Sequence, residues 1–243
     1  MVNAETVSGF VLAAGYGTRM GALTAHTPKP LLEALGAPLV AHALFFLHQL
    51  GIRSVVLNSH YLGEQIEERL KHIKSMELQF SYERTILGTA GGIRFALDKV
   101  QGESVIVVNP DVLLWPATRL TIDGLEVARG SADALLFVAK RAGDETGLRL
   151  YPDGNLAFEH NGPDYFVGCS FMRTHIFQEL ASGSVAELGN LWRGLADRGA
   201  LRGLPFEGEV VDMGSETAYL RNKGMSVPAA SAGAWESFRR EFE

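Results

Sequence analysis

The chain has 243 residues, of which 47% are hydrophobic and 21% are charged, so it can bury a sizeable core. This composition excludes a disordered, collagen-like or coiled-coil protein. Lys and Arg total 22 against 28 Asp and Glu, and the formal net charge of −6 argues against a nucleic-acid binder with a broad basic face. Any phosphate group must therefore be bound by a local feature of the chain.

Cysteine content and hydropathy indicate a cytoplasmic protein without a membrane partner. The single cysteine, Cys169, allows no intramolecular disulfide, and no Cys or His group has the spacing of zinc ligands. The apolar run over residues 9–14 is too short for a signal sequence and leads directly into Gly15. No segment approaches the ~20 apolar residues of a membrane span.

Strands and helices are predicted to alternate through the first half of the chain. A buried strand over 7–13 is followed by a long loop over 14–30. Helical spacing of apolar residues and β-rich runs then predict helices over 38–50 and 63–73 and strands over 54–57, 78–82 and 104–109. A turn over 87–92 and a helix from there to residue 100 are also expected. Strands that are apolar throughout are typical of a parallel sheet covered on both faces.

The second half is less regular, and a β-rich insertion is expected there. The predicted elements are a helix over 118–129, a strand over 132–139, short strands and turns over 143–162, a strand over 165–173, a helix over 186–198, a short strand over 209–212 and a helical C-terminal segment. Asp153-Gly154 is a hairpin signal within the insertion. Because no repeat or linker divides the chain, we predict one α/β domain.

The strongest local motif is the glycine-rich loop after the first strand. It contains Gly15, Gly17 and Arg19, and Lys29 follows between two prolines. Glycines let a ligand approach the backbone closely, and N–H groups in such turns form an anion-binding concavity. A Rossmann fingerprint would need a glycine where Met20 stands, and the Gly-Lys-Ser/Thr of a Walker A loop is absent. The motif predicts phosphate binding assisted by two cations, rather than a loop of merely solvated charges.

Two aspartates follow predicted strands. Asp111 comes shortly after the strand over 104–109, and Asp212 ends the strand over 209–212. In open sheets, ligands bind at the carboxyl ends of strands, and Mg²⁺ takes one or two carboxylates plus substrate phosphates. Taken singly, either aspartate is better explained as a turn or helix-cap residue. Together they suggest a divalent-cation site.

Other polar residues are ambiguous. Glu83 either contacts a nucleobase or ends a strand. His42 and His48 are expected on a helix surface or partly buried, and Cys169 is expected to pack as a small apolar residue. No nucleophile elbow or zinc-binding histidine pair is present, so serine, cysteine and zinc hydrolysis are set aside.

Four motifs resemble those of the sugar-1-phosphate nucleotidylyltransferases. They are residues 12–19 with Pro28-Lys29-Pro30, the turn over 87–92, Asn109-Pro110-Asp111, and Val211-Asp212-Met213-Gly214. The resemblance spans residues 9 to about 220. It implies the nucleotide-diphospho-sugar transferase type of fold, a Rossmann-like, mostly parallel mixed sheet with helices on both faces and a small β-rich insertion on the sugar side. It divides the chain into a nucleotide-binding half (about 7–112), a sugar-binding half (about 113–214) and a C-terminal helical segment (about 215–243).

The resemblance also assigns roles to individual residues. It implies that Arg19 and Lys29 are catalytic, bridging the α-phosphate and the departing pyrophosphate, and that Asp111 and Asp212 hold Mg²⁺. The implied nucleotide contacts are Leu12, Ala13, Ala14, Gly15, Tyr16, Gly17, Thr18, Lys29, Gly88, Thr89 and Gly91. The implied sugar contacts are Asn109, Gly147, Glu159 and Gly168. Two departures stand out, since Pro110 replaces the usual glycine and His160 replaces a lysine that often follows the sugar-site glutamate.

The implied reaction is Mg²⁺-dependent transfer of a nucleotidyl group from an NTP to a sugar 1-phosphate. A sugar 1-phosphate is mostly dianionic near pH 7, with a second pKa of about 6, so it can attack without a general base. Residues 58–66 resemble the branch that uses UTP and N-acetylmuramate 1-phosphate in peptidoglycan recycling. Alternatives stay open: another sugar 1-phosphate, CTP with phosphocholine, GTP with a mannose- or heptose-type phosphate, or a non-catalytic nucleotide sensor. A homo-oligomer is also left open.

Overall fold

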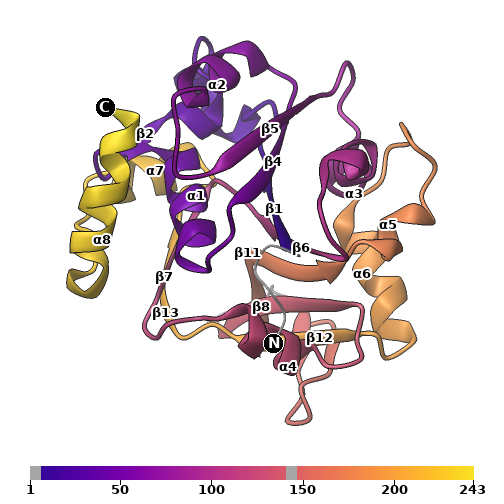
Figure 1. Ribbon diagram of the computed structural model, residues 1–243. Coiled ribbons are helices and arrows are strands. Elements are labelled where there is room, and N and C mark those ends of the chain that lie inside the picture. Colours follow the sequence, from indigo (N-terminus) through magenta and orange to yellow (C-terminus); the bar gives the residue numbers. More distant parts are fainter. Residues whose placement is uncertain (1–6, 141–146) are drawn as a thin grey trace.

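A mixed nine-stranded sheet forms the centre of the computed structural model, which describes residues 7–140 and 147–243 (Figure 1). Along the sheet the strands are β10 (Leu156–Phe158), β9 (Leu148–Leu150), β11 (Asp164–Arg173), β6 (Ser104–Val108), β1 (Val7–Leu12), β4 (Ser54–Ser59) and β5 (Glu77–Tyr82), and β8 (Ala134–Lys140) joins β11 to β12 (Leu201–Pro205). The strands from β6 to β5 are parallel, whereas β11 runs antiparallel to both β6 and β8. The predicted fold class is confirmed.

Helices cover both faces of this sheet, with α1 and α8 on one side and α3, α5 and α6 on the other (Figure 1). The helices are α1 (Leu39–Gln49), α2 (Gly63–Leu70), α3 (Gly88–Phe95), α4 (Ile122–Arg129), α5 (His175–Gln178), α6 (Leu188–Asp197), α7 (Glu216–Asn222) and α8 (Ala229–Arg239). In β6, Ile106 and Val108 enter one core and Val105 and Val107 enter the other. Because both faces are buried, the strand is apolar at every position after Ser104.

Two small antiparallel ladders lie outside the main sheet. The strand β7 (Val112–Pro116) pairs with β13 (Gly208–Asp212), and β2 (Glu33–Ala34) pairs with β3 (Ala37–Pro38). Asp212 is in register with Val112, the residue after Asp111, and the Met213 N–H donates to the Asp111 carbonyl at 2.8 Å. This ladder therefore brings the two predicted metal-binding aspartates together from distant parts of the chain.

Several predicted boundaries were wrong. The turn expected over 87–92 is instead the first part of α3, which begins at Gly88. The helix expected from 118 begins at Ile122, because Thr121 caps it by accepting from the Gly124 N–H at 3.2 Å. The strands β7 and β12 were missed. The hairpin signal at Asp153-Gly154 is confirmed by β9 and β10, whereas residues 143–146 of the expected insertion lie outside the described ranges.

His42, which was expected on a helix surface or partly buried, is instead almost fully buried. Its side chain is 3% exposed and stacks on Trp235 of α8, with ring centroids 4.1 Å apart. The ring Nε2 lies 3.0 Å from the Ala34 carbonyl, so it carries a proton and donates to this oxygen. Burial lowers the pKa of His42 to about 4, and the hydrogen bond to Ala34 offsets part of that shift. Cys169 is buried as expected, and burial raises the pKa of its thiol.

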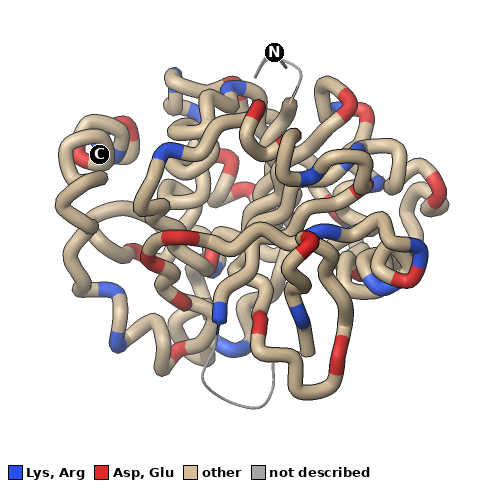
Figure 2. The backbone as a smooth tube through the Cα atoms, turned by 90° about the horizontal axis from the view of Figure 1, so that it is seen from below, with Lys and Arg blue, Asp and Glu red and all other residues tan. Residues whose placement is uncertain are grey.

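The charged residues form no broad single-sign face in the view of Figure 2, where Lys and Arg positions are interspersed with Asp and Glu. Within residues 7–140 and 147–243, every helix is too short or too polar to cross a bilayer.

Candidate active site

A pocket of about 370 Å³ lies at the carboxyl ends of β1, β4 and β6. Most of the predicted site residues line it, namely the nucleotide contacts Leu12, Ala13, Ala14, Gly15, Tyr16, Gly17, Thr18, Lys29, Gly88 and Thr89, together with the catalytic Arg19, the sugar contact Asn109 and the metal ligand Asp111. The predicted residues Gly91, Gly147, Glu159, Gly168 and Asp212 do not line it. Asn58, Glu83, Ile86, Pro110 and Glu187 do line it without having been assigned to the site, although Glu83 had been considered.

The glycine-rich loop has one glycine in a left-handed turn and another on an open surface. Gly17 has a φ of +68°, and a Cβ there would stand 3.0 Å from Thr24 Cγ2 and 3.2 Å from Lys29 Cβ. A side chain at Gly17 would therefore be strained by both its backbone and its neighbours. Gly15 has no atom within 4 Å of a Cβ position, so its backbone is accessible to a ligand.

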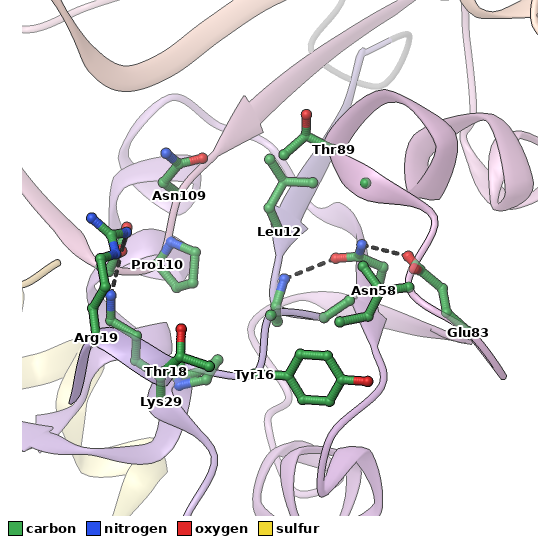
Figure 3. A pocket seen from close by; sticks show the side chains of 18 of the residues that line it. Leu12, Tyr16, Thr18, Arg19, Lys29, Asn58, Glu83, Thr89, Asn109 and Pro110 are labelled. Atoms are coloured by element: carbon green, nitrogen blue, oxygen red, sulfur yellow. Dashed lines mark hydrogen bonds and ion pairs between the residues drawn. The ribbon is translucent and has the colours of Figure 1, made fainter. Parts of the chain in front are cut away.

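One end of the pocket is cationic and contains a partly buried lysine. The Lys29 side chain is 12% exposed, and its Nζ lies 2.5 Å from Asp111 Oδ2 and 3.0 Å from the Gly214 carbonyl. Arg19 Nη2 lies 3.8 Å from the same Asp111 oxygen, and its side chain is 73% exposed. Figure 3 shows Arg19 and Lys29 together at this side of the pocket. The arrangement places two cations and one carboxylate side by side at this end of the pocket.

Asp212 lies next to this cluster. Its Oδ1 accepts from the Gly214 N–H at 2.7 Å and lies 2.8 Å from the Cβ position of Gly214, while Asp111 Oδ2 lies 3.6 Å from that position. The two carboxylates therefore border the same glycine. In the described part of the chain, no group of three His, Cys, Asp or Glu side chains suits a metal ion. Two carboxylates suit Mg²⁺ if substrate oxygens complete its coordination.

The opposite end of the pocket is anionic (Figure 3). Glu83 is 1% exposed, and its carboxylate accepts from Asn58 Nδ2 at 2.7 Å and from the Leu87 N–H at 2.9 Å. Asn58 Oδ1 in turn accepts from the Ala13 N–H at 2.8 Å. This chain of bonds fixes the glycine-rich loop to β4 and to the start of α3. The sequence signal that could have identified Asn58 is its position directly after the apolar residues 55–57 of β4.

The Asn58 to Glu83 contact predicts a large effect for Asn58→Asp. An aspartate retains the shape but loses the donor, and it places a second carboxylate against buried Glu83. We expect the free energy of unfolding to fall by about 2 to 4 kcal/mol near neutral pH. Urea unfolding measures this change. Asn190→Asp, at an exposed asparagine of α6, is the control, and equal stability of the two variants would contradict the assigned role of Asn58.

The start of α3 packs against a segment from the second half of the chain. The Ala90 and Gly91 N–H groups donate to the Ala186 carbonyl at 2.9 and 3.0 Å. A Cβ on Gly91 would lie 2.4 Å from the Ser184 carbonyl oxygen. Gly91 is therefore a packing glycine that allows this close approach, rather than part of the pocket wall.

Tyr16 extends the pocket wall outward and is held by a histidine. His60 Nδ1 lies 2.7 Å from the Glu83 carbonyl and donates a hydrogen bond to it. In the neutral tautomer with the proton on Nδ1, Nε2 accepts a hydrogen bond from the Tyr16 hydroxyl over 3.1 Å. The two rings meet edge to face, with centroids 5.2 Å apart. Tyr16 remains 53% exposed, so its ring is available to a ligand at the rim.

The predicted sugar contacts form two separate pairs. The Asn109 N–H donates to the Gly168 carbonyl at 2.8 Å, and Asn109 alone of the four lines the pocket. The Glu159 N–H donates to the Gly147 carbonyl at 3.0 Å in the β9 and β10 hairpin. The Glu159 carboxylate accepts from the Tyr151 hydroxyl and from Arg149 Nε, and these two bonds lower its pKa. The assigned sugar-site glutamate is thus engaged by its neighbours.

Fold and site together define a nucleotidyltransferase. The nucleotidyl transferase family model matches residues 8–147, and the chain belongs to this family. The resemblance to sugar-1-phosphate nucleotidylyltransferases seen in the motifs is therefore confirmed.

Two relatives are similar over most of the chain, and a third over less than half of it. The chain is 33% identical to the N-acetylmuramate alpha-1-phosphate uridylyltransferase of Neisseria meningitidis serogroup B, over 93% of this chain and 98% of that protein. It is 31% identical to the enzyme of the same name from Caulobacter vibrioides, over 86% and 93%. A mannose-1-phosphate guanylyltransferase catalytic subunit beta from Drosophila melanogaster is 42% identical, but over only 42% of this chain and 29% of that one.

Solved structures share the fold. HddC from Yersinia pseudotuberculosis superposes with a TM-score of 0.70 at 19% identity, covering 88% of this chain and 97% of that one. The same protein complexed with GMP-PN gives a TM-score of 0.73 at 18% identity, with the same coverage.

Proposed function

We propose that the protein transfers a uridylyl group from UTP to a sugar 1-phosphate, with N-acetylmuramate 1-phosphate as the acceptor, and releases pyrophosphate. The observation that carries this proposal is the cluster of Lys29, Arg19 and Asp111 at one end of a pocket whose other end contains Glu83. The choice of UTP and of the acceptor is supported by the printed activity of the relatives from Neisseria meningitidis and Caulobacter vibrioides. Peptidoglycan recycling is the corresponding proposed role.

The chemical step needs positioning and charge stabilisation rather than proton transfer. An oxygen of the acceptor phosphate attacks the α-phosphorus of the NTP, and the bond from that phosphorus to the oxygen bridging to the β-phosphate breaks. The acceptor is already mostly dianionic near neutral pH, so no base is required. Arg19 and Lys29 bind the α-phosphate and the departing pyrophosphate and stabilise the charge that develops in line.

A divalent cation fits the oxygen donors at this end of the pocket. Asp111 and Asp212 would hold Mg²⁺, which would neutralise phosphate charge and polarise the reacting phosphoryl group when bound. Lys29 neutralises Asp111 through the 2.5 Å contact. We therefore expect Lys29 to exchange Asp111 for a phosphate oxygen when the nucleotide binds.

The anionic end supports UTP over CTP. Glu83 accepts from Asn58 and Leu87 as a carboxylate, so it presents only acceptor lone pairs. The N3–H of uracil and the N1–H of guanine are donors, whereas N3 of cytosine and N1 of adenine are acceptors. An acceptor at this wall favours uracil and guanine. The names of the relatives from Neisseria meningitidis and Caulobacter vibrioides, both uridylyltransferases, support uracil over guanine.

The test is pyrophosphate release with Mg²⁺, pairing UTP, CTP, GTP, ATP and dTTP with a panel of sugar 1-phosphates and phosphocholine. We expect release with UTP and N-acetylmuramate 1-phosphate and much weaker release with CTP or ATP. Release only with another pair would replace the proposed substrates. Nucleotide binding without any release would instead favour a non-catalytic nucleotide sensor. The homo-oligomer and the cytoplasmic location stay predictions from the sequence.

A further inference from the structure

Besides Asp111 and Glu83, a third carboxylate lines the pocket and comes from the other half of the chain. Glu187 directly precedes α6, and its Oε2 accepts from the Thr89 N–H at 3.2 Å and from the Thr89 hydroxyl at 2.7 Å. Thr89 Oγ1 also accepts from the Leu188 N–H at 2.8 Å. Glu187 therefore caps the start of α3 while Thr89 caps the start of α6. This reciprocal contact holds the Glu187 carboxylate in one orientation at the pocket rim.

The contact leaves one oxygen of Glu187 available to a ligand. Among the residues that the structure describes, only Thr89 donates to this carboxylate, and both of its donors bind Oε2. Oε1 lies 2.6 Å from the point where a Cβ of Gly88 would stand, and Gly88 has a φ of +73°. A side chain at Gly88 would collide with Oε1, so this glycine allows the Glu187 carboxylate to hold its position. Glu187 itself is exposed, unlike buried Glu83.

The charges of the pocket decide which part of a nucleotide can lie beside Glu187. Arg19 and Lys29 occupy one side, and Thr89, the partner of Glu187, lies on a different side (Figure 3). A carboxylate repels a polyphosphate, so the phosphates belong with the cations and the uncharged nucleoside belongs near Glu187. Donors on a nucleoside are the ribose hydroxyls and the base N–H groups. Under the proposed function, the base N–H is bound by Glu83, which leaves the ribose hydroxyls.

We propose that Glu187 is a specificity-determining residue that accepts a hydrogen bond from a ribose hydroxyl of the NTP and so selects ribonucleotides over deoxyribonucleotides. This inference rests on the proposed function for the orientation of the nucleotide. A carboxylate that accepts from a ribose hydroxyl is an established way for proteins to bind a nucleotide. Thr89 orients the carboxylate, and Gly88 allows the carboxylate to lie at this position on the pocket rim.

The experiment compares UTP, 2′-deoxy-UTP and 3′-deoxy-UTP in the wild-type protein and in Glu187→Ala. We expect the wild type to prefer UTP over at least one deoxy analogue by about 10- to 100-fold in kcat/KM, and the variant to lose that preference. Binding of the three nucleotides is measured in parallel by calorimetry without the acceptor. Glu179→Ala, which removes another exposed glutamate of the same half, is the matched control and keeps the preference.

Two results would overturn the inference. One is a wild type that binds and uses the three nucleotides equally. The other is a Glu187→Ala variant that weakens all three by the same factor, since a purely structural cap would act in that way. Should Glu187→Ala fail to fold, Glu187→Gln takes its place. The glutamine has one side-chain oxygen, and Thr89 needs it as an acceptor, so no oxygen is left for the ribose hydroxyl and the preference for UTP should still fall. Absence of turnover in the wild type would refute the proposed function instead, and the calorimetric comparison would still test Glu187.

Discussion

Replacing Asp111 by alanine is expected to reduce pyrophosphate release by roughly 100- to 1000-fold, or about 3 to 4 kcal/mol of transition-state stabilisation, by analogy with the loss of one preorganised electrostatic group. Asp111 forms an ion pair with both cations of the site, because Lys29 Nζ lies 2.5 Å and Arg19 Nη2 lies 3.8 Å from its Oδ2. Its loss removes the proposed metal ligand and also leaves Lys29 without its carboxylate. Turnover is measured with UTP and the acceptor at saturating Mg²⁺.

The fold should survive this substitution. The Met213 N–H donates to the Asp111 backbone carbonyl, and β7 pairs with β13 through the main chain, so these bonds do not depend on the carboxylate. Asp111→Asn keeps the size and should be nearly as inactive, because charge rather than shape is lost. Arg19→Ala should act in the same direction, with folding unaffected because the side chain is 73% exposed. Asp98→Ala, at an exposed aspartate of the helix Leu97–Lys99, is the control. Near-normal turnover of Asp111→Ala would show that the assigned role is wrong.

The free energy of unfolding is expected to fall by about 3 kcal/mol through His42 alone as the pH is lowered from about 7 to about 4. Burial holds the pKa of folded His42 at about 4, against an ordinary value of 6.5. Below 6.5 the unfolded chain binds a proton that the folded protein does not accept until about pH 4. The contribution of neutral His42 is therefore complete above pH 6.5 and is lost progressively as the pH falls from 6.5 towards 4.

The comparison with His42→Gln isolates this effect from the titration of other groups. Glutamine does not titrate, and its amide can still donate to the Ala34 carbonyl that Nε2 contacts in the wild type. Urea unfolding at several pH values should therefore show a flatter dependence for this variant, by up to about 3 kcal/mol across the window. His72→Gln, at an exposed histidine, should follow the wild type. An unchanged pH dependence in His42→Gln would mean that folding does not lower the pKa of His42.

The sequence by itself determined the features that depend on neighbouring residues. Apolar runs such as that of β6 predicted strands covered on both faces, because the alternation of side chains sends successive residues into opposite cores. The glycine-rich loop predicted a phosphate site, since Gly17 needs its positive φ and Gly15 needs its open surface within a short stretch. Asp111 was likewise predicted as a site residue because it follows a predicted strand, and ligands bind at the carboxyl ends of strands in open sheets.

Only the tertiary structure decided which distant groups meet. Lys29 and Asp111 are 82 residues apart, and Lys29 and Gly214 are 185 apart. The same holds for Thr89 and Glu187, which are 98 residues apart and whose contact caps the start of α3. Gly91, predicted in a turn, lies in this helix and packs against Ser184 instead of lining the pocket. Burial of His42 against Trp235 required α8 to lie on α1. Such contacts escape local patterns because chain topology and packing, rather than residue spacing, select the partner of each polar group.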